Sequence, residues 1–585
     1  MKTTVNDQPQ VGLRRDPWLV ALVLIVHVGL WWWAQPIIEG SDDLSYATFA
    51  HRMQTGSFRF EAHHFAHRLG ILSPTALLYS LFGVNPYTTA GWSLICSLLT
   101  IWGVYRVALP LAGRLAALLA AWVLATNTFW LEQALALGPD LPVAACAFAA
   151  LAVLAQARNP GGCRLSPREA GLLVALALTA AVLTKLSIIW VGYFLVLVML
   201  HDLYHGRHRA LWGWIAVSGG VMGALYLGVY QVLRGDPLYH LHVVNQIYNN
   251  PYGIWTYSVE SGNSLMARLT YQPLRMILEI PGFVTLVFLS IPLAWLFLKQ
   301  VEPARRGEYR YWLGMMGLVL FVFWFATNSF QYYNPMMLCG RYLMFLFPPA
   351  ALLAGAILAG LIQSPRRGAL VVPMAGVGAA MVLVLQGFGF WKREILLLEL
   401  CLLVLAVERW WPAVARRHQR RLATGLVVAT LVILPVLAVG QGVLGPTVWQ
   451  KIYRGLMRES LAPLQEPVVL YTDARVITTL EWMTGFRSPD HVRMVNWRTP
   501  GLRVFLPAGG ARRWILLNAR DEQADRLQAL LKDPPREWKL LWKSRHSAKD
   551  AAYLFETSEA DPIPTLFSRF PEQMTPNVVQ PKSAS

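Results

Sequence analysis

Long apolar runs alternate with short polar segments along most of this 585-residue chain, a pattern typical of a polytopic membrane protein. A helix of roughly 20 apolar residues crosses the hydrocarbon layer, and a window of that length finds about thirteen runs. They lie near residues 17–37, 87–107, 114–135, 140–157, 169–184, 187–203, 211–232, 281–299, 311–329, 342–363, 368–388, 395–411 and 422–444. We therefore expect residues 1–445 to form a polytopic α-helical membrane domain.

The chain changes character after the last apolar run. Strand-like runs at 467–471 and 514–517 alternate with a helical run at 521–531, which predicts a small extracytoplasmic α/β domain over residues 446–557. Residues 558–585 are rich in Pro and Ser and lack periodicity, so a poorly ordered end is expected. None of the five cysteines lies in the tail domain, which excludes a disulfide scaffold there.

The composition excludes a soluble protein. Hydrophobic residues make up 55% of the chain and charged residues only 14%, against roughly a quarter charged in soluble domains. The formal charge of +18 would suit a nucleic-acid binder, but the basic residues form short clusters between apolar runs instead of one stripe. Such clusters on alternate loops mark the cytoplasmic side, so the N-terminus is predicted inside and the C-terminal domain outside.

Asp42 and Asp43 stand just beyond the first apolar run, at the start of a segment with a helical period, residues 41–50. Carboxylates are costly near hydrocarbon, so a pair at the mouth of a membrane protein indicates chemistry. The structural alternative is that acidic residues in the first turn of an interfacial helix interact favourably with the helix dipole.

Isolated charges follow at the same predicted outer interface. Arg68 lies in the extracytoplasmic segment 38–86, and Lys185 ends an apolar run. Asp140 begins one run, and Arg341 precedes another. Carboxylates beside such cations suit transfer from a phosphate-linked donor. Structural roles stay open: a helix cap for Asp140, and simple interface anchoring for Lys185 and Arg341.

Five short motifs occur in a fixed order. They are Asp42-Asp43 with Tyr46, Arg68 before an amphipathic run ending in Phe82-Gly83, Asp140, Thr184-Lys185, and Arg341-Tyr342 before Pro348-Pro349. The order resembles the membrane glycosyltransferases of the protein-mannosyltransferase and lipid A aminoarabinose transferase superfamily, a glycosyltransferase family 39-like group with the GT-C fold. Asp43 replaces the family's Glu, and the family's Lys-Pro-Pro is absent. The resemblance is good to about residue 200, looser to about 363 and weak beyond.

The resemblance implies a hexosyl- or pentosyltransferase that moves a sugar from a polyprenyl-phosphate carrier, such as undecaprenyl phosphate, to an acceptor on the periplasmic face of a bacterial-type inner membrane. It implies an inverting reaction in which Asp42 is the general base, with Asp43 or Asp140 orienting the acceptor or a metal ion. The implied roles of the remaining residues are donor-phosphate binding by Arg68, Lys185 and Arg341, and substrate binding by Tyr46, His67 and Tyr342.

The implied partners are the lipid-linked sugar donor, a lipid, protein or glycan acceptor, and membrane lipids. Neither a nucleotide nor a nucleic acid is required. A divalent metal ion, with Asp42 and Asp140 as ligands, is left open as a cofactor. The identity of the sugar and of the acceptor is also open, because acceptor contacts would come from loops where the resemblance fades.

Two further segments carry alternatives. His63 and His67 would share a helix face and hold a metal, although loop histidines without a third ligand are usually solvated. The extracytoplasmic segment 233–280 has an amphipathic pattern around Arg268 and Arg275, typical of a surface segment or of a mobile lid over the donor.

Other function classes compete with the enzyme. A polytopic transporter or lipid flippase for a glycan-linked lipid is the main alternative, although it would usually show internal repeats and charges near the midplane. A channel or structural subunit would not need the acidic pair. Within the enzymes, an oligosaccharide ligase or polymerase would differ in donor size and not in architecture.

Overall fold

The computed structural model describes residues 17–36, 38, 41–159, 165–248, 265–280, 298, 301, 303–327, 333–336, 338–363, 448–461, 463, 466–472, 474–486, 491–496, 511–519, 535–545 and 551–558. The chain divides into two compact units. The first comprises Met1–Pro36, Ser57–Thr75 and Ala90–Leu444, and the second comprises Ile37–Gly56, Ala76–Thr89 and Gly445–Ser585. The second unit thus adds two segments from near the N-terminus to the predicted tail domain.

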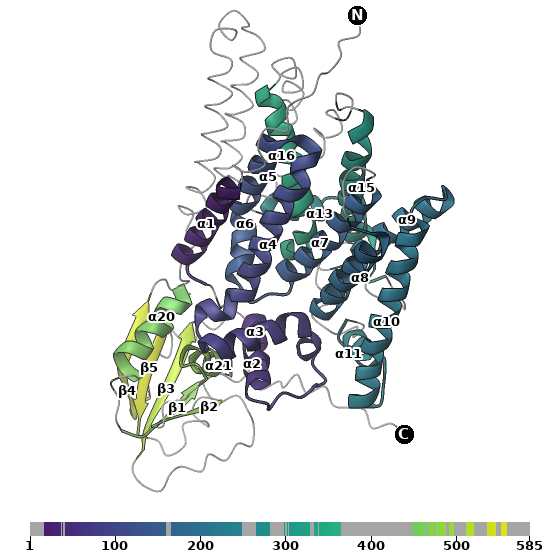
Figure 1. The fold of residues 1–585 in the computed structure, drawn as a ribbon. Coiled ribbons are helices and arrows are strands. Elements are labelled where there is room, and N and C mark those ends of the chain that lie inside the picture. The colour runs from purple at the N-terminus through teal and green to yellow at the C-terminus, as the bar shows by residue number, and fades with distance from the viewer. Residues whose placement is uncertain are drawn as a thin grey trace, which may run out of the picture. The chain divides into compact units, whose positions relative to one another are not determined.

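The first unit is helical (Figure 1). Its elements are α1 (Pro17–Ala34), η1 (His64–His67), α4 (Pro86–Ala112, from Ala90 on), α5 (Arg114–Ala125), α6 (Thr128–Leu135), α7 (Asp140–Arg158), α8 (Pro167–Thr184), η2 (Leu186–Ile188), α9 (Ile189–Tyr204), α10 (Arg209–Arg234), α11 (Tyr239–Tyr248), α12 (Leu265–Leu269), α13 (Gln272–Glu279), α15 (Pro303–Phe325), η4 (Gly340–Leu346) and α16 (Phe347–Gln363). The helix α3 (Leu69–Phe82) begins in this unit.

The chain is a multi-pass helical membrane protein. Within the described residues, seven helical segments are long and apolar enough to cross a membrane, or eight if α5 and α6 form one bent span. The predicted runs at 281–299 and between 368 and 444 lie largely outside the described residues. The predicted number of thirteen therefore stays a prediction.

A chain of buried side-chain hydrogen bonds lies at the break between α5 and α6, whose axes are bent by 56° relative to each other. The Nδ1 atom of His27 lies 2.7 Å from the carbonyl oxygen of Ala125, so Nδ1 carries the proton. The other ring nitrogen accepts from Ser97 at 2.9 Å, and the Ser97 oxygen accepts from the Trp130 indole at 2.8 Å. Because unpaired polar groups are costly inside a membrane, these bonds make the broken span tolerable.

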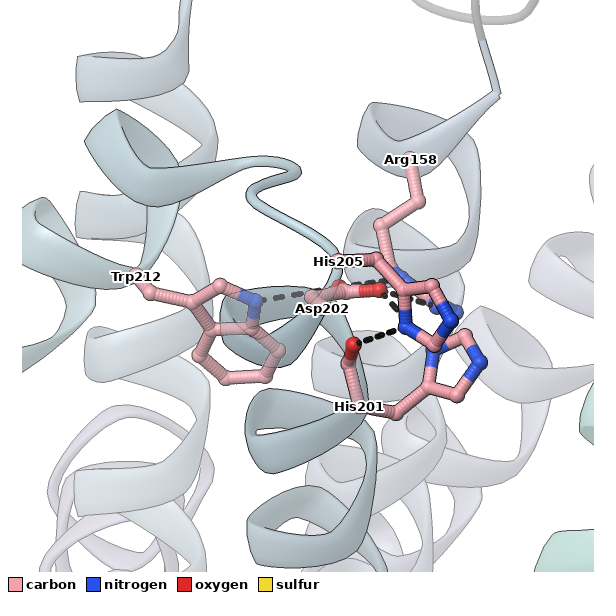
Figure 2. A network of polar contacts seen from close by, with 5 residues as sticks. All are labelled: Arg158, His201, Asp202, His205 and Trp212. Atoms are coloured by element: carbon pink, nitrogen blue, oxygen red, sulfur yellow. Dashed lines mark hydrogen bonds and ion pairs between the residues drawn. The ribbon is translucent and has the colours of Figure 1, made fainter.

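A second buried network joins α7, α9 and α10 (Figure 2). Nε and Nη2 of Arg158 each donate to a carboxylate oxygen of Asp202 at 2.7 Å, and the Trp212 indole donates to the same carboxylate at 3.0 Å. The charge of Asp202 is therefore fully paired. Arg158 ends α7 and Asp140 begins it, so the network lies about 27 Å along the helix axis from Asp140.

The second unit contains a five-stranded sheet with strand order β2-β1-β3-β5-β4. Strand β1 runs parallel to β2 and β3, whereas β5 is antiparallel to β3 and β4. The strands are β1 (Val468–Thr472), β2 (Val492–Asn496), β3 (Arg512–Ala519), β4 (Trp538–Arg545) and β5 (Ala551–Thr557). The predicted strand-like runs correspond to β1 and β3, and the predicted helical run at 521–531 lies outside the described residues.

Two helices of this unit cover the same face of the sheet. Apolar side chains of α20 (Val448–Leu456) and α21 (Ala474–Met483) join one core cluster with alternate residues of β1, β3 and β5. Since alternate residues of a strand share one face, both helices lie on that face. The helix α2 (Ser41–Gln54), from the N-terminal part of the chain, packs against α21 (Figure 1).

Candidate functional site

Asp140, Lys185 and Arg341 form a buried ion cluster in the first unit. Asp140 is 3% exposed, and its Oδ1 accepts from the Lys185 ammonium. Its Oδ2 lies 3.6 Å from Nε of Arg341. Asp140 opens α7, Lys185 caps the end of α8, and Arg341 lies in η4. Three elements that are distant in sequence therefore bring two cations to one carboxylate.

Tyr342 and Trp190 support the Lys185 ammonium. The Nζ atom of Lys185 lies 4.2 Å from the centroid of the Tyr342 ring, within the range of a cation–π contact. The ring of Tyr342 meets that of Trp190 edge-on, with 5.8 Å between centroids. Tyr342, predicted as a substrate residue, thus contacts the cation cluster, and its substrate contact stays a proposal.

Arg68 supplies a third cation. It follows η1, is 9% exposed, and its guanidinium carbon lies 5.0 Å from the centroid of the Phe65 ring. The charges of both Arg68 and Arg341 act electrostatically on Lys185. Three cations therefore lie close to the buried carboxylate of Asp140 and to one another. Such a cluster suits an anion with several oxygens, above all a phosphate.

Gly70 permits the close approach that brings Arg68 to the cluster. A Cβ atom at Gly70 would lie 2.2 Å from Oγ1 of Thr184, 2.9 Å from the backbone nitrogen of the same residue and 3.0 Å from the carbonyl of Ala180. The start of α3 therefore packs directly on the last turn of α8, next to Lys185. Only glycine allows backbones to approach so closely.

Replacing Gly70 by Ala is expected to lower turnover at least tenfold and stability by about 1–3 kcal/mol, because overpacking forces α3 away from α8. Thermal unfolding in detergent and the rate of carrier-phosphate release measure the two effects. Gly29→Ala is the matched control, since no heavy atom lies within 4 Å of a Cβ there. Wild-type turnover in Gly70→Ala would disprove the positioning effect.

The loop before Arg68 is held by a buried histidine cluster, although histidines in such loops are usually solvated. His67 is 0% exposed. Its Nε2 lies 3.0 Å from the carbonyl of Glu61, so Nε2 carries the proton and Nδ1 accepts from the Tyr230 hydroxyl at 3.0 Å. The His67 ring also stacks on His240, with 5.0 Å between centroids. A substrate contact by His67 would have to replace one of these bonds.

Burial is the main cause of low pKa values in this cluster. It lowers the pKa of His67 to about 4, and the charges of Arg234 and His63 act in the same direction while the Glu61 carbonyl opposes them. Burial also lowers the pKa of His240 to about 3, assisted by electrostatic interactions with His67 and with the charge of Arg68. Both rings are therefore neutral at physiological pH.

Stability is expected to fall as the pH drops from about 6.5 to about 4. Within this window the unfolded chain binds a proton at His67 that the folded protein excludes, so protonation favours unfolding. The variant His67→Gln keeps a donor for the Glu61 carbonyl and removes the titration. Its melting temperature should therefore fall less between pH 7 and pH 5 than that of wild type. An equal fall in both proteins would contradict this assignment.

The acidic pair lies in the second unit. The structure confirms the predicted helix at residues 41–50 as part of α2, which continues to Gln54. Asp42 and Asp43 are half-buried in its first turn, and Tyr46 is fully buried one turn later. The predicted catalytic and substrate-binding roles of these three residues stay proposals.

The metal prediction has no direct support. Within the described residues, no group of three or more His, Cys, Asp or Glu side chains is arranged to hold a metal ion. Both carboxylate oxygens of Asp140 face cations, Lys185 and Arg341. A metal ion held by Asp42 and Asp140 therefore stays a prediction.

Arg268 differs from the expectation of a surface residue in the segment 233–280. It is 0% exposed and donates to the carbonyls of Phe323, Trp324 and Met336 at 2.9–3.1 Å. The first two are terminal carbonyls of α15, which have no partner within their own helix. A cation is also favourable at that end of the helix dipole. The amphipathic pattern did not reveal these acceptors, because they come from another helix.

Both a protein-family model and solved structures match this chain. Residues 74–226 match the family model of dolichyl-phosphate-mannose-protein mannosyltransferases. The crystal structure of ArnT from Cupriavidus metallidurans bound to undecaprenyl phosphate aligns with 92% of this chain and 98% of ArnT, at 17% identity and a TM-score of 0.56. This chain has the GT-C fold. The apo structure of the same ArnT aligns with 92% of this chain and 97% of ArnT, at 18% identity and a TM-score of 0.54.

The region that matches the family model contains part of the ion cluster of this GT-C chain. It includes Asp140 and Lys185, whereas Arg68, Arg341 and the acidic pair lie outside it. No curated protein matches the chain by sequence. The family model and the GT-C fold therefore agree on membrane glycosyltransferases as the group that this chain resembles.

Proposed function

We propose that this protein transfers a sugar from a polyprenyl-phosphate carrier to an acceptor on the periplasmic face of the inner membrane, with inversion at the anomeric carbon. The observation that carries the proposal is the convergence of Arg68, Lys185 and Arg341 near one buried carboxylate. The GT-C fold and the family-model match over residues 74–226 support it.

In this proposal the three cations stabilise the departing phosphate. As the bond between the anomeric carbon and the phosphate oxygen breaks, the electron pair stays on that oxygen and the phosphate gains negative charge. The positive charges of Arg68, Lys185 and Arg341 stabilise this state more than the bound donor, which lowers the barrier. Asp140 faces Lys185 and Arg341, so we assign it to holding the two cations in place rather than to the acceptor.

The acidic helix α2 serves the acceptor in this proposal. Asp42 takes the proton of the acceptor hydroxyl while its oxygen attacks the anomeric carbon from the face opposite the phosphate. Asp43 orients the acceptor. The products are the glycosylated acceptor, the protonated carboxyl of Asp42 and the free polyprenyl phosphate, which regains no proton from the protein in this step.

Reconstitution tests the proposal. The purified protein is incorporated into liposomes with undecaprenyl-phosphate-linked pentoses or hexoses and candidate acceptors, and release of free undecaprenyl phosphate is followed. Release that depends on an acceptor is expected for at least one donor. Movement of intact lipid-linked sugar between leaflets without release would instead establish a flippase.

A further inference from the structure

The turn that ends α21 has an unusual backbone. Gly485 and Phe486 both have left-handed φ angles, +68° and +60°. Glycine adopts this conformation freely, but a bulky aromatic residue does so rarely. The turn is closed by a bond from the Phe486 amide to the carbonyl of Glu481 at 2.6 Å. Strained residues persist where the surrounding structure requires them, often at functional sites.

The strained turn presents the Phe486 ring to the acidic helix. The ring stacks on His51 of α2 with 4.6 Å between centroids and an angle of 8° between planes. His51 lies near the end of the same helix whose first turn holds Asp42 and Asp43. A helix rises 1.5 Å per residue, so the stack lies about 13 Å from Asp42 along one rigid rod.

A second contact joins α21 to the end of α3 and the start of α4. The Trp482 indole donates to Oγ1 of Thr89 at 3.1 Å, and that hydroxyl also bonds the Tyr79 hydroxyl at 2.9 Å. All three side chains are buried. Thus α21 is anchored independently of its contact with α2, and Phe486 extends from an immobilised helix.

We propose that Phe486 is a positioning residue for catalysis: the C-terminal α/β domain sets the orientation of the acidic helix α2 through the stack of Phe486 on His51. This inference rests on the proposed function, in which Asp42 is the general base. It gives the domain a part in the chemistry, because a small displacement of a base from its proton lowers the rate steeply. It also accounts for a strained aromatic residue at this turn.

The test is Phe486→Asn in the full-length protein. Asn tolerates the left-handed conformation, so the melting temperature should stay equal or rise, while loss of the ring should lower kcat about tenfold or more without changing KM for the donor. Phe486→Tyr keeps the ring and should keep kcat. The double variant His51→Ala/Phe486→Asn should be no slower than the slower single variant, because both remove one interaction.

The outcomes separate this inference from the proposed function. Unchanged kcat in Phe486→Asn, with Asp42→Asn inactive, would overturn the positioning role and leave the proposed function intact. Parallel losses of melting temperature and kcat would show mere structural support and would also overturn it. Full turnover in Asp42→Asn would instead refute the general base, and the positioning role with it.

Discussion

Replacing Asp42 by Asn is expected to lower kcat by about 10²–10⁴-fold, the usual contribution of a general base. The change removes one charge and one proton acceptor and preserves the shape of the side chain. Binding of the carrier lipid should stay unchanged, because the proposed phosphate contacts come from Arg68, Lys185 and Arg341. Release of free undecaprenyl phosphate by reconstituted protein measures the effect.

Two further variants calibrate the Asp42 result. Asp43→Asn, one position along the same helix, should lower kcat by a smaller factor. The Asp43 side chain points about 100° away from that of Asp42, and in the proposed function it orients the acceptor without taking its proton. Asp236→Asn should keep full turnover: Asn still accepts the bond from the amide of Leu238 near the start of α11, and the change loses only an exposed ion pair with His242. Undiminished turnover in Asp42→Asn would remove Asp42 from the mechanism.

Replacing Lys185 by Met is expected to lower turnover by about 10²–10³-fold, comparable to the loss of one donor from a site that stabilises developing charge. It should also destabilise the protein by about 3–5 kcal/mol, because Asp140 stays buried without its nearest cation. The rate of carrier-phosphate release and thermal unfolding in detergent report the two effects separately.

The double variant Lys185→Met/Asp140→Asn distinguishes a structural from a chemical role of Lys185. Removing both charges leaves the net charge of the cluster as in wild type and leaves no buried carboxylate without its cation, so the melting temperature should return toward that of wild type. Turnover should stay low, because the leaving phosphate still lacks its cation. Recovery of turnover together with stability would mean that Lys185 only compensates Asp140.

Gly70 of the site and His27 of the surrounding fold carried local signals that the sequence analysis did not use. Gly70 interrupts an apolar helix, a pattern that indicates close backbone approach. His27 is an ionisable residue inside an apolar run, which marks a polar contact within the membrane. Neither signal names the partner, and the partners, Thr184 for Gly70 and Ala125 for His27, come from distant helices.

Burial of polar residues was the point where sequence reasoning failed most clearly. His67 lies in a short polar loop, where histidines are usually solvated, and Arg268 in a segment interpreted as an amphipathic surface segment or a lid over the donor. The structure buries both, because Tyr230 and the carbonyls of α15 supply hydrogen-bond partners. Local pattern reports the polarity of a residue, whereas burial depends on whether another element offers partners.

The sequence alone determined that this is a multi-pass helical membrane protein, and it singled out the charged residues at the ends of its spans. Both follow from local composition, since a bilayer selects apolar segments by length and penalises charge within them. Only the tertiary structure decided that Arg68, Lys185 and Arg341 gather near Asp140, and that residues 37–56 and 76–89 belong with the C-terminal domain. Such convergence depends on close packing between helices far apart in the chain, which no single segment encodes.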